Sequence, residues 1–326
     1  MQVDPVVVGL PVSGAVANKK NVKFGSYNPN AARKIEQEIA RNGIKCNMKG
    51  NDFLAECCNK TINVFQKLFK HSYLPSKLSY TEMSKSTYAT FDKYSNEVSL
   101  NRSHDYGCFY NMENLKKEAK KLYNPILPGW TSSNHPAHIF VHEFSHAAHW
   151  NHLKERHGKS NAIKVMEGLH YTPVPTAIGR LITKFKLSKY AANGNMKEFL
   201  AERMTKDICD GLTDEYWVTY KNIDVDYSNI FSKKWNYRYS SPQSYIDYFT
   251  QQVWDGDIDG AKRVGEDATQ YLKKLEATNA PIAVTITEKA TEGVPLLGKI
   301  TRAIGGAFER FTERADKRNK LKVGRY

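Results

Sequence analysis

The chain has 326 residues, enough for one large domain or two small ones around a substantial core. Its 48 lysines and arginines against 34 aspartates and glutamates give a formal net charge of +14, which favours acidic partners such as nucleic acid or anionic membrane surfaces. Five cysteines without a C-x-x-C pair argue against a disulfide framework. The sequence contains no uninterrupted apolar stretch of about 18 residues, so no membrane-spanning helix is predicted.

Residues 1–30 are rich in Gly, Pro, Asn, Val and Lys, and this composition predicts an extended N-terminal arm with little structure of its own. The start lacks the cationic segment typical of a signal peptide, which together with the cysteine usage favours an intracellular or particle-enclosed setting. Such an arm could bind an assembly partner by tying one subunit to the next.

The next elements are expected to be a helical layer over residues 31–84, followed by a β-hairpin. Residues 31–42 and 52–71 are predicted to be helices, and in the second of them apolar side chains recur at helical spacing. Residues 87–101 contain two β-prone runs around a turn near 92–96, which predicts a hairpin. One of its strands could bind an extended peptide by strand addition, although an ordinary hairpin of a core sheet fits equally. Residues 111–123 are expected to form a charged, exposed helix.

The segment from Ile139 to His149 contains H-E-x-x-H, with His142, Glu143 and His146 in the motif positions. On a helix, residues four apart lie on one face, so both imidazoles can reach one metal ion while Glu143 reaches a water bound to it. Pro136 is a plausible first helical residue. A core helix whose histidines are only hydrogen-bonded is the alternative. His138, His149 and His152 flank the motif, and most of the histidines in this region are expected to support the ligands or to lie at the surface.

A second helix is predicted after Asn193 or Asn195, either of which can cap it. Glu198 and Glu202 lie four residues apart and share one of its faces. A catalytic zinc needs three protein ligands and one open position, and a glutamate from this helix would complete the two histidines. A solvated helix face carrying both glutamates is the alternative.

These two stretches together resemble the gluzincin metallopeptidases, most closely the peptidase domain of the anthrax-lethal-factor type. The family's downstream motif is matched by Ser188, Tyr190, Asn193, Glu198, Phe199, Ala201 and Glu202. Leu200 stands where the family has a second aromatic residue, and the interval from Tyr190 to Glu198 is one residue longer. The resemblance implies that Glu198 is the third zinc ligand, that Glu202 holds a ligand histidine, and that Tyr190 stabilises an oxyanion.

Two further motifs follow residue 210. Tyrosines at 237, 239, 245 and 248, near a helix expected at Pro242, suit either core packing or a substrate cleft. The run Asp255–Gly260 with Glu266 in the twelfth place formally matches an EF-hand calcium loop, while an acidic turn that caps the next helix is the alternative. Residues 293–326 carry a basic amphipathic pattern that suits an anionic membrane, nucleic acid or a partner groove.

The fold expected from these features is α+β: a mainly helical, zincin-like metallopeptidase domain with a small β-sheet at residues 85–280, after the arm (1–30) and the helical layer (31–84) and before a basic C-terminal tail (281–326). The leading hypothesis is a zinc-dependent peptidase acting on a protein or peptide, with Glu143 as general base. The alternative is a structural or cargo protein of a viral particle or other assembly, with a zincin-like domain of little or no proteolytic activity. Nucleic-acid binding through the basic surface is a third possibility.

Overall fold

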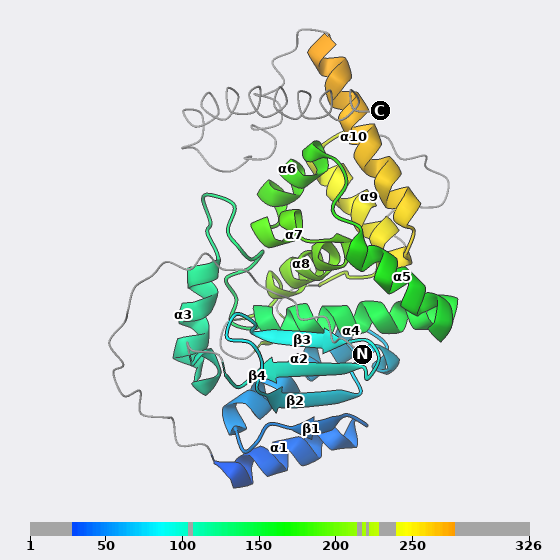
Figure 1. Cartoon of the computed structure of the whole chain (residues 1–326). Coiled ribbons are helices and arrows are strands. Elements are labelled where there is room, and N and C mark those ends of the chain that lie inside the picture. The colour runs from blue at the N-terminus through cyan, green and yellow to red at the C-terminus, as the bar shows by residue number, and fades with distance from the viewer. Residues whose placement is uncertain (1–27, 104–106, 214–216, 220–221, 228–238, 278–326) are drawn as a thin grey trace.

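The computed structural model describes residues 28–103, 107–213, 217–219, 222–227 and 239–277 (Figure 1). The expected tail (281–326), including the amphipathic pattern at 293–326, lies outside these residues, as does the expected arm except for residues 28–30. The described part is mainly helical with one small sheet, which confirms the α+β class.

The sheet has four strands in the spatial order β1-β2-β4-β3. Strands β1 (Lys45–Asn47), β2 (Lys77–Thr81) and β4 (Glu97–Asn101) are parallel, and β3 (Ala89–Asp92) is the antiparallel edge strand. The predicted hairpin is therefore confirmed. Its turn is closed by the Asp92 carboxylate, which accepts hydrogen bonds from the backbone N–H groups of Tyr94 (3.0 Å) and Ser95 (3.1 Å).

Strands β1 and β2 lie within the segment expected to be a helical layer, so that expectation was incomplete. With three and five residues, these strands are too short for their alternation to stand out in the sequence. Because β2 pairs with β4 along its whole length, the boundary expected at residues 84/85 falls inside a single sheet.

The helices expected in the first third of the chain are present. Helix α2 shows why it forms: the Asn51 side chain accepts the Leu54 N–H at 2.9 Å, and Leu54, Cys58, Ile62 and Phe65 form a fully buried stripe. The elements of this part are α1 (Pro29–Arg41), α2 (Asp52–Leu68), the short 3-10 turns η1 (His71–Tyr73) and η2 (Cys108–Tyr110), and α3 (Met112–Leu122).

Helix α4 (His138–His157) runs along the sheet beside β3 and packs on its other side against α8 (Met196–Cys209) (Figure 1). It does not include Pro136, which was expected in its first turn. The Ser133 hydroxyl accepts the His135 N–H at 3.1 Å and the His135 ring accepts the Ala137 N–H at 3.0 Å. These side chains satisfy the backbone in a separate turn, so the helix begins two residues later.

The remaining helices form the opposite end of the molecule from the sheet (Figure 1). They are α5 (Lys159–Tyr171), α6 (Ala177–Lys186), α7 (Lys189–Asn193), α9 (Pro242–Asp255) and α10 (Ile258–Ala277). Tyr239 and Tyr245 are buried, and the ring of Tyr245 stacks on Phe249 at 5.5 Å. These two tyrosines therefore belong to the core, whereas Tyr237 lies outside the described residues.

Residues 255–266, which formally match an EF-hand calcium loop, do not form such a loop in the structure. Helix α9 ends at Asp255, Gly256 has φ of 77°, and α10 begins at Ile258. Asp257 accepts the Gly260 N–H at 2.8 Å, so the acidic turn caps the next helix. Residues 258–266 are helical and cannot wrap around an ion as an EF-hand loop does, so the alternative of an acidic turn that caps the next helix is the one confirmed.

None of the described helices combines the length and the apolar character needed to span a membrane. All five cysteines are free thiols, and four of them are buried. Buried thiols of this kind pack as small apolar side chains.

Candidate metal centre

Helix α4 brings His142 and His146 together by one helical turn. Their ring centroids lie 4.9 Å apart with the ring planes nearly perpendicular, at 85°. Both side chains are buried, at 7% and 2% exposure, because the helix lies between the sheet and α8. The imidazoles therefore face the interface between α4 and α8 and not the solvent.

Helix α8 supplies the third group from 52 residues further along the chain. The Oε2 atom of Glu198 lies 3.1 Å from Nε2 of His142 and 3.2 Å from Nε2 of His146. The Asn195 side chain caps α8 by accepting the Glu198 N–H at 3.1 Å, which fixes the first turn that carries this carboxylate. The three ligands expected from the sequence therefore converge, and the solvated-face alternative for Glu198 is wrong.

The cluster has the donor chemistry and the size that a zinc ion requires. Zinc–ligand bonds of about 2.0–2.2 Å at tetrahedral angles place neighbouring ligand atoms about 3.3–3.5 Å apart, close to the two observed nitrogen–oxygen distances. All three ligand atoms lie within 4.8 Å of one another, and within the described residues no other group of three His, Cys, Asp or Glu side chains lies as close. The residues present therefore fit a divalent transition metal.

Glu202 orients His142. Its Oε1 atom accepts a hydrogen bond from Nδ1 of His142 at 3.0 Å, and its Oε2 atom accepts one from the backbone N–H of Ser132 at 2.8 Å. With its Nδ1 proton held by Glu202, the His142 ring is oriented so that Nε2 is directed at the cluster. Glu202 thus lies where the resemblance implied. Ser132 was missed, because a backbone donor leaves no signal in the sequence.

The charges of the cluster are coupled. Burial by itself raises the pKa of Glu198, but His146, Lys197 and the hydrogen bonds from both histidines hold that pKa well below its usual range. Burial lowers the pKa of His142, but its hydrogen bonds to Glu198 and Glu202 raise that pKa to about 10. Burial lowers the pKa of His146 to about 4. An ionised carboxylate therefore faces the imidazoles, and a metal would displace a proton from His142.

Glu143 lies beside the cluster without belonging to it. The side chain is only 4% exposed, and burial raises the pKa of its carboxyl to about 7. Its Oε2 atom has no hydrogen-bond partner within the described residues. A buried carboxyl with such a pKa and an unused oxygen is suited to exchanging protons near neutral pH.

Tyr190 and Lys197 complete the surroundings of the cluster. Tyr190 lies on α7 with its ring 5.7 Å from the ring of His142, and burial raises the pKa of its hydroxyl well above the ordinary value, so it stays a proton donor. The ammonium of Lys197 lies 3.4 Å from Oε1 of Glu198. Lys197 was not anticipated, although its place next to Glu198 in the sequence was a usable signal.

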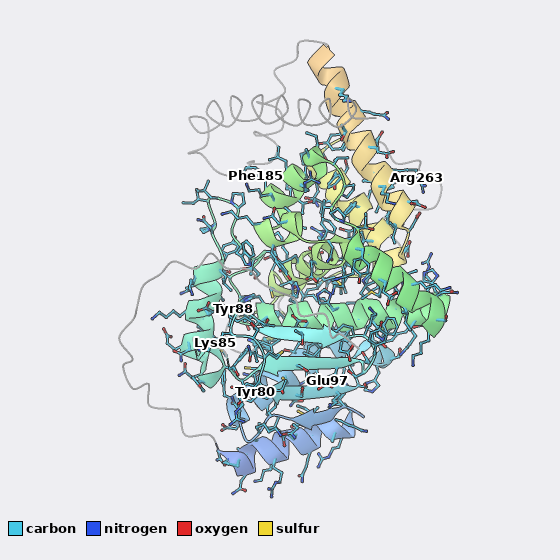
Figure 2. The ribbon with its side chains drawn as sticks, in the orientation of Figure 1. Tyr80, Lys85, Tyr88, Glu97, Phe185 and Arg263 are labelled. Carbon is cyan, nitrogen blue, oxygen red and sulfur yellow. The ribbon has the colours of Figure 1, made fainter. Side chains whose placement is uncertain are left out.

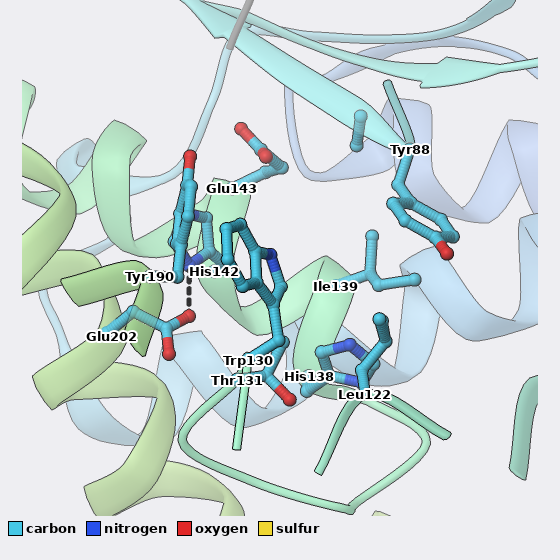
Figure 3. Close-up of a pocket in the computed structure, with 11 residues that line it drawn as sticks. Tyr88, Leu122, Trp130, Thr131, His138, Ile139, His142, Glu143, Tyr190 and Glu202 are labelled. Carbon is cyan, nitrogen blue, oxygen red and sulfur yellow. Dashed lines mark hydrogen bonds and ion pairs between the residues drawn. The ribbon is translucent and has the colours of Figure 1, made fainter. Parts of the chain in front are cut away.

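A cavity of about 50 Å³ adjoins the cluster (Figure 3). One end is lined by His142, Glu143, Tyr190 and Glu202. The other end is mostly apolar, and its main lining residues are Tyr88, Leu122, Trp130, His138 and Ile139. The sequence did not indicate that these residues line one pocket, because they come from separate elements. These are the residue before β3, helices α3 and α4, and the loop between α3 and α4.

His149 and His152 do not take part in the cluster. Both rings stack on Trp254, with centroid distances of 5.6 Å and 4.2 Å. His149 is 1% exposed, so the expectation of a surface or ligand-supporting role is wrong for this residue. These histidines instead join α4 to α9.

Comparison of the chain with models of protein families, with curated proteins and with solved structures gave no match. The resemblance to gluzincins therefore depends on the two motifs quoted above.

Proposed function

We propose that the chain is a zinc-dependent peptidase. The observation that supports this most is the convergence of His142, His146 and Glu198 in a buried cluster. Beside the cluster lie a cavity and the Oε2 atom of Glu143, which has no hydrogen-bond partner among the described residues. Two imidazoles and one carboxylate are the usual protein ligands of a hydrolytic zinc, which keeps one position open. Zinc held by these residues would supply Lewis acidity, which lowers the pKa of a bound water toward about 7 and polarises a carbonyl group.

Glu143 is the general base and acid in this proposal. Because the pKa of its carboxyl is about 7, the ionised form takes a proton from the attacking water, and the protonated form then gives it to the leaving amine. The oxygen that lacks a partner is the one free to carry this proton.

Tyr190 and the edge strand β3 position the substrate. The Tyr190 hydroxyl keeps its proton and can donate a hydrogen bond to the oxygen that becomes negative in the transition state. Among the described strands, β3 pairs only with β4, and Ala89 at the start of β3 lines the cavity. An extended peptide added to the other edge would therefore bring its backbone alongside the cluster.

The decisive experiment compares the hydrolysis of a peptide library, followed by mass spectrometry, by the Glu143→Gln chain and by the parent chain, both loaded with zinc. The substitution removes the proton-accepting group but preserves size, so peptide hydrolysis is expected to fall by at least about a hundredfold while zinc content is unchanged. Glu113→Gln, the same substitution on the exposed face of α3, is the matched control and is expected to cleave like the parent. Cleavage by Glu143→Gln at the parent rate would disprove the mechanism.

The alternative of a structural or cargo protein depends on the arm and the tail, which lie outside the described residues, so no contact in the structure argues for it. A parent chain that binds zinc, cleaves no peptide in the library and forms stoichiometric assemblies would favour that alternative.

A further inference from the structure

The far end of the cavity contains one polar atom whose hydrogen-bonding capacity is unused. His138, in the first turn of α4, lines the cavity and is 3% exposed. Its Nδ1 atom lies 3.1 Å from the carbonyl oxygen of His135, whereas its Nε2 atom is buried and has no partner within the described residues. Figure 3 shows the ring next to Ile139 and Leu122 at the end of the cavity away from Glu143.

The surroundings of His138 decide what Nε2 can do. A carbonyl oxygen only accepts hydrogen bonds, so Nδ1 must carry the proton. Burial lowers the pKa of His138 to about 4, so the ring is neutral at pH 7 and Nε2 presents a bare lone pair. This atom is therefore an acceptor, and leaving it unpaired in an apolar environment is unfavourable.

Two other polar side chains at this end of the cavity have partners. The Tyr88 hydroxyl donates to the carboxylate of Glu118 on α3, and Figure 2 shows Tyr88 just before β3 and beside α3. The Thr131 hydroxyl donates to the carbonyl oxygen of Ser133 at 3.2 Å. An entering group therefore meets mostly apolar walls, the indole of Trp130 and the unpaired acceptor Nε2 of His138.

We propose that this end of the cavity is a specificity pocket that selects a short substrate side chain carrying a hydrogen-bond donor, such as threonine, with Nε2 of His138 as the acceptor. The inference rests on the proposed peptidase function, because the pocket is continuous with the cluster through His142 and Glu143. A cavity of about 50 Å³ holds a few water-sized groups, which suits a side chain of three or four heavy atoms. Valine has the shape of threonine but lacks the donor, so it would leave Nε2 unpaired.

The test uses zinc-loaded full chain and peptide pairs that differ only in threonine or valine at each position flanking the scissile bond. At one position the threonine peptide is expected to have a kcat/KM about tenfold or more above that of the valine peptide. In His138→Phe, which removes the acceptor and keeps a flat ring, the ratio is expected to approach one. His149→Phe, the same change at a buried position of α4 outside the cavity, is expected to keep the parent ratio.

Binding supplies a second readout that needs no turnover. In the Glu143→Gln background, the threonine peptide is expected to bind about tenfold more tightly than the valine peptide. Binding is monitored by the fluorescence of Trp130 in the cavity wall. Histidine NMR of the parent chain, which is independent of peptidase activity, should show His138 as the Nδ1–H tautomer.

The outcomes separate the two proposals. Cleavage of both peptides at equal rates at every position, or His138 found as the Nε2–H tautomer, overturns the specificity pocket and leaves the peptidase in place. If the parent chain cleaves no peptide and the Glu143→Gln chain binds none, both proposals fall together. If His138→Phe does not fold, the threonine-to-valine ratio of the parent and the tautomer of His138 still decide.

Discussion

Replacing Glu202 with alanine removes the carboxylate that orients a proposed metal ligand. In the parent chain its two oxygens accept hydrogen bonds from Nδ1 of His142 at 3.0 Å and from the Ser132 N–H at 2.8 Å. Loss of the partner that holds a ligand imidazole is expected to weaken zinc binding about 10–100-fold. The orphaned, buried Ser132 N–H is expected to lower the free energy of unfolding by about 1–3 kcal/mol.

The Glu202→Gln chain should have a zinc affinity and a free energy of unfolding between those of Glu202→Ala and the parent. Burial raises the pKa of Glu202, but its hydrogen bond from His142 and the positive charge there lower it, so the carboxyl is ionised and both oxygens accept. Glutamine has one accepting oxygen and a donating NH₂ group. It can therefore satisfy His142 or Ser132, but not both.

Zinc affinity is measured by competition with a chelator of known affinity, and stability by urea unfolding of the metal-free chains. Asn151→Ala is the matched control, because Asn151 is a buried residue of α4 about two turns beyond His142 and outside the cluster. Its amide donates to the carbonyl oxygens of Leu74 (3.1 Å) and Ala147 (3.0 Å). It should destabilise the fold without changing the zinc affinity. A folded Glu202→Ala chain that binds zinc as tightly as the parent would refute the orienting role.

Three further predictions test the cluster and the fold around it. Glu198→Ala should reduce the zinc content of the purified chain from one equivalent to near zero by elemental analysis, and full retention would remove Glu198 from the ligand set. Asn195→Ala removes the cap of α8 and should cost about 1 kcal/mol of stability in urea unfolding; an unchanged midpoint would show that the cap contributes nothing. His149 stays neutral when folded because burial lowers its pKa well below the usual value, whereas the unfolded chain binds a proton below about pH 6.5. The parent should therefore lose about 1.4 kcal/mol of stability from this residue for each pH unit below 6.5, until the folded pKa of His149 is reached. His149→Phe, which keeps a ring on Trp254, should not show this loss. Parallel curves of unfolding free energy against pH for the two chains between pH 7 and 5 would contradict the prediction.

The sequence by itself determined the features that depend on near neighbours along the chain. The spacing of His142 and His146 sets their shared face through the geometry of one helical turn. The hairpin of β3 and β4 follows from two β-prone runs and a turn that Asp92 can close, and the start of α8 follows from a capping asparagine. These predictions were confirmed because each involves interactions that span no more than about a dozen residues.

Tertiary packing decided the rest. From the residues alone, Glu198 and Glu202 were interchangeable on one helical face, and only the packing of α8 against α4 places Glu198 on both Nε2 atoms and Glu202 on Nδ1 of His142. Strands β1 and β2 exist because each pairs with residues more than 15 positions away, which no local periodicity reveals. The residues Asp255 to Glu266 match a loop motif, yet they form the end of one helix and the start of the next, since the flanking helices pack on each other. Local sequence therefore fixes which side chains share a face, whereas the contacts between distant elements fix what that face meets.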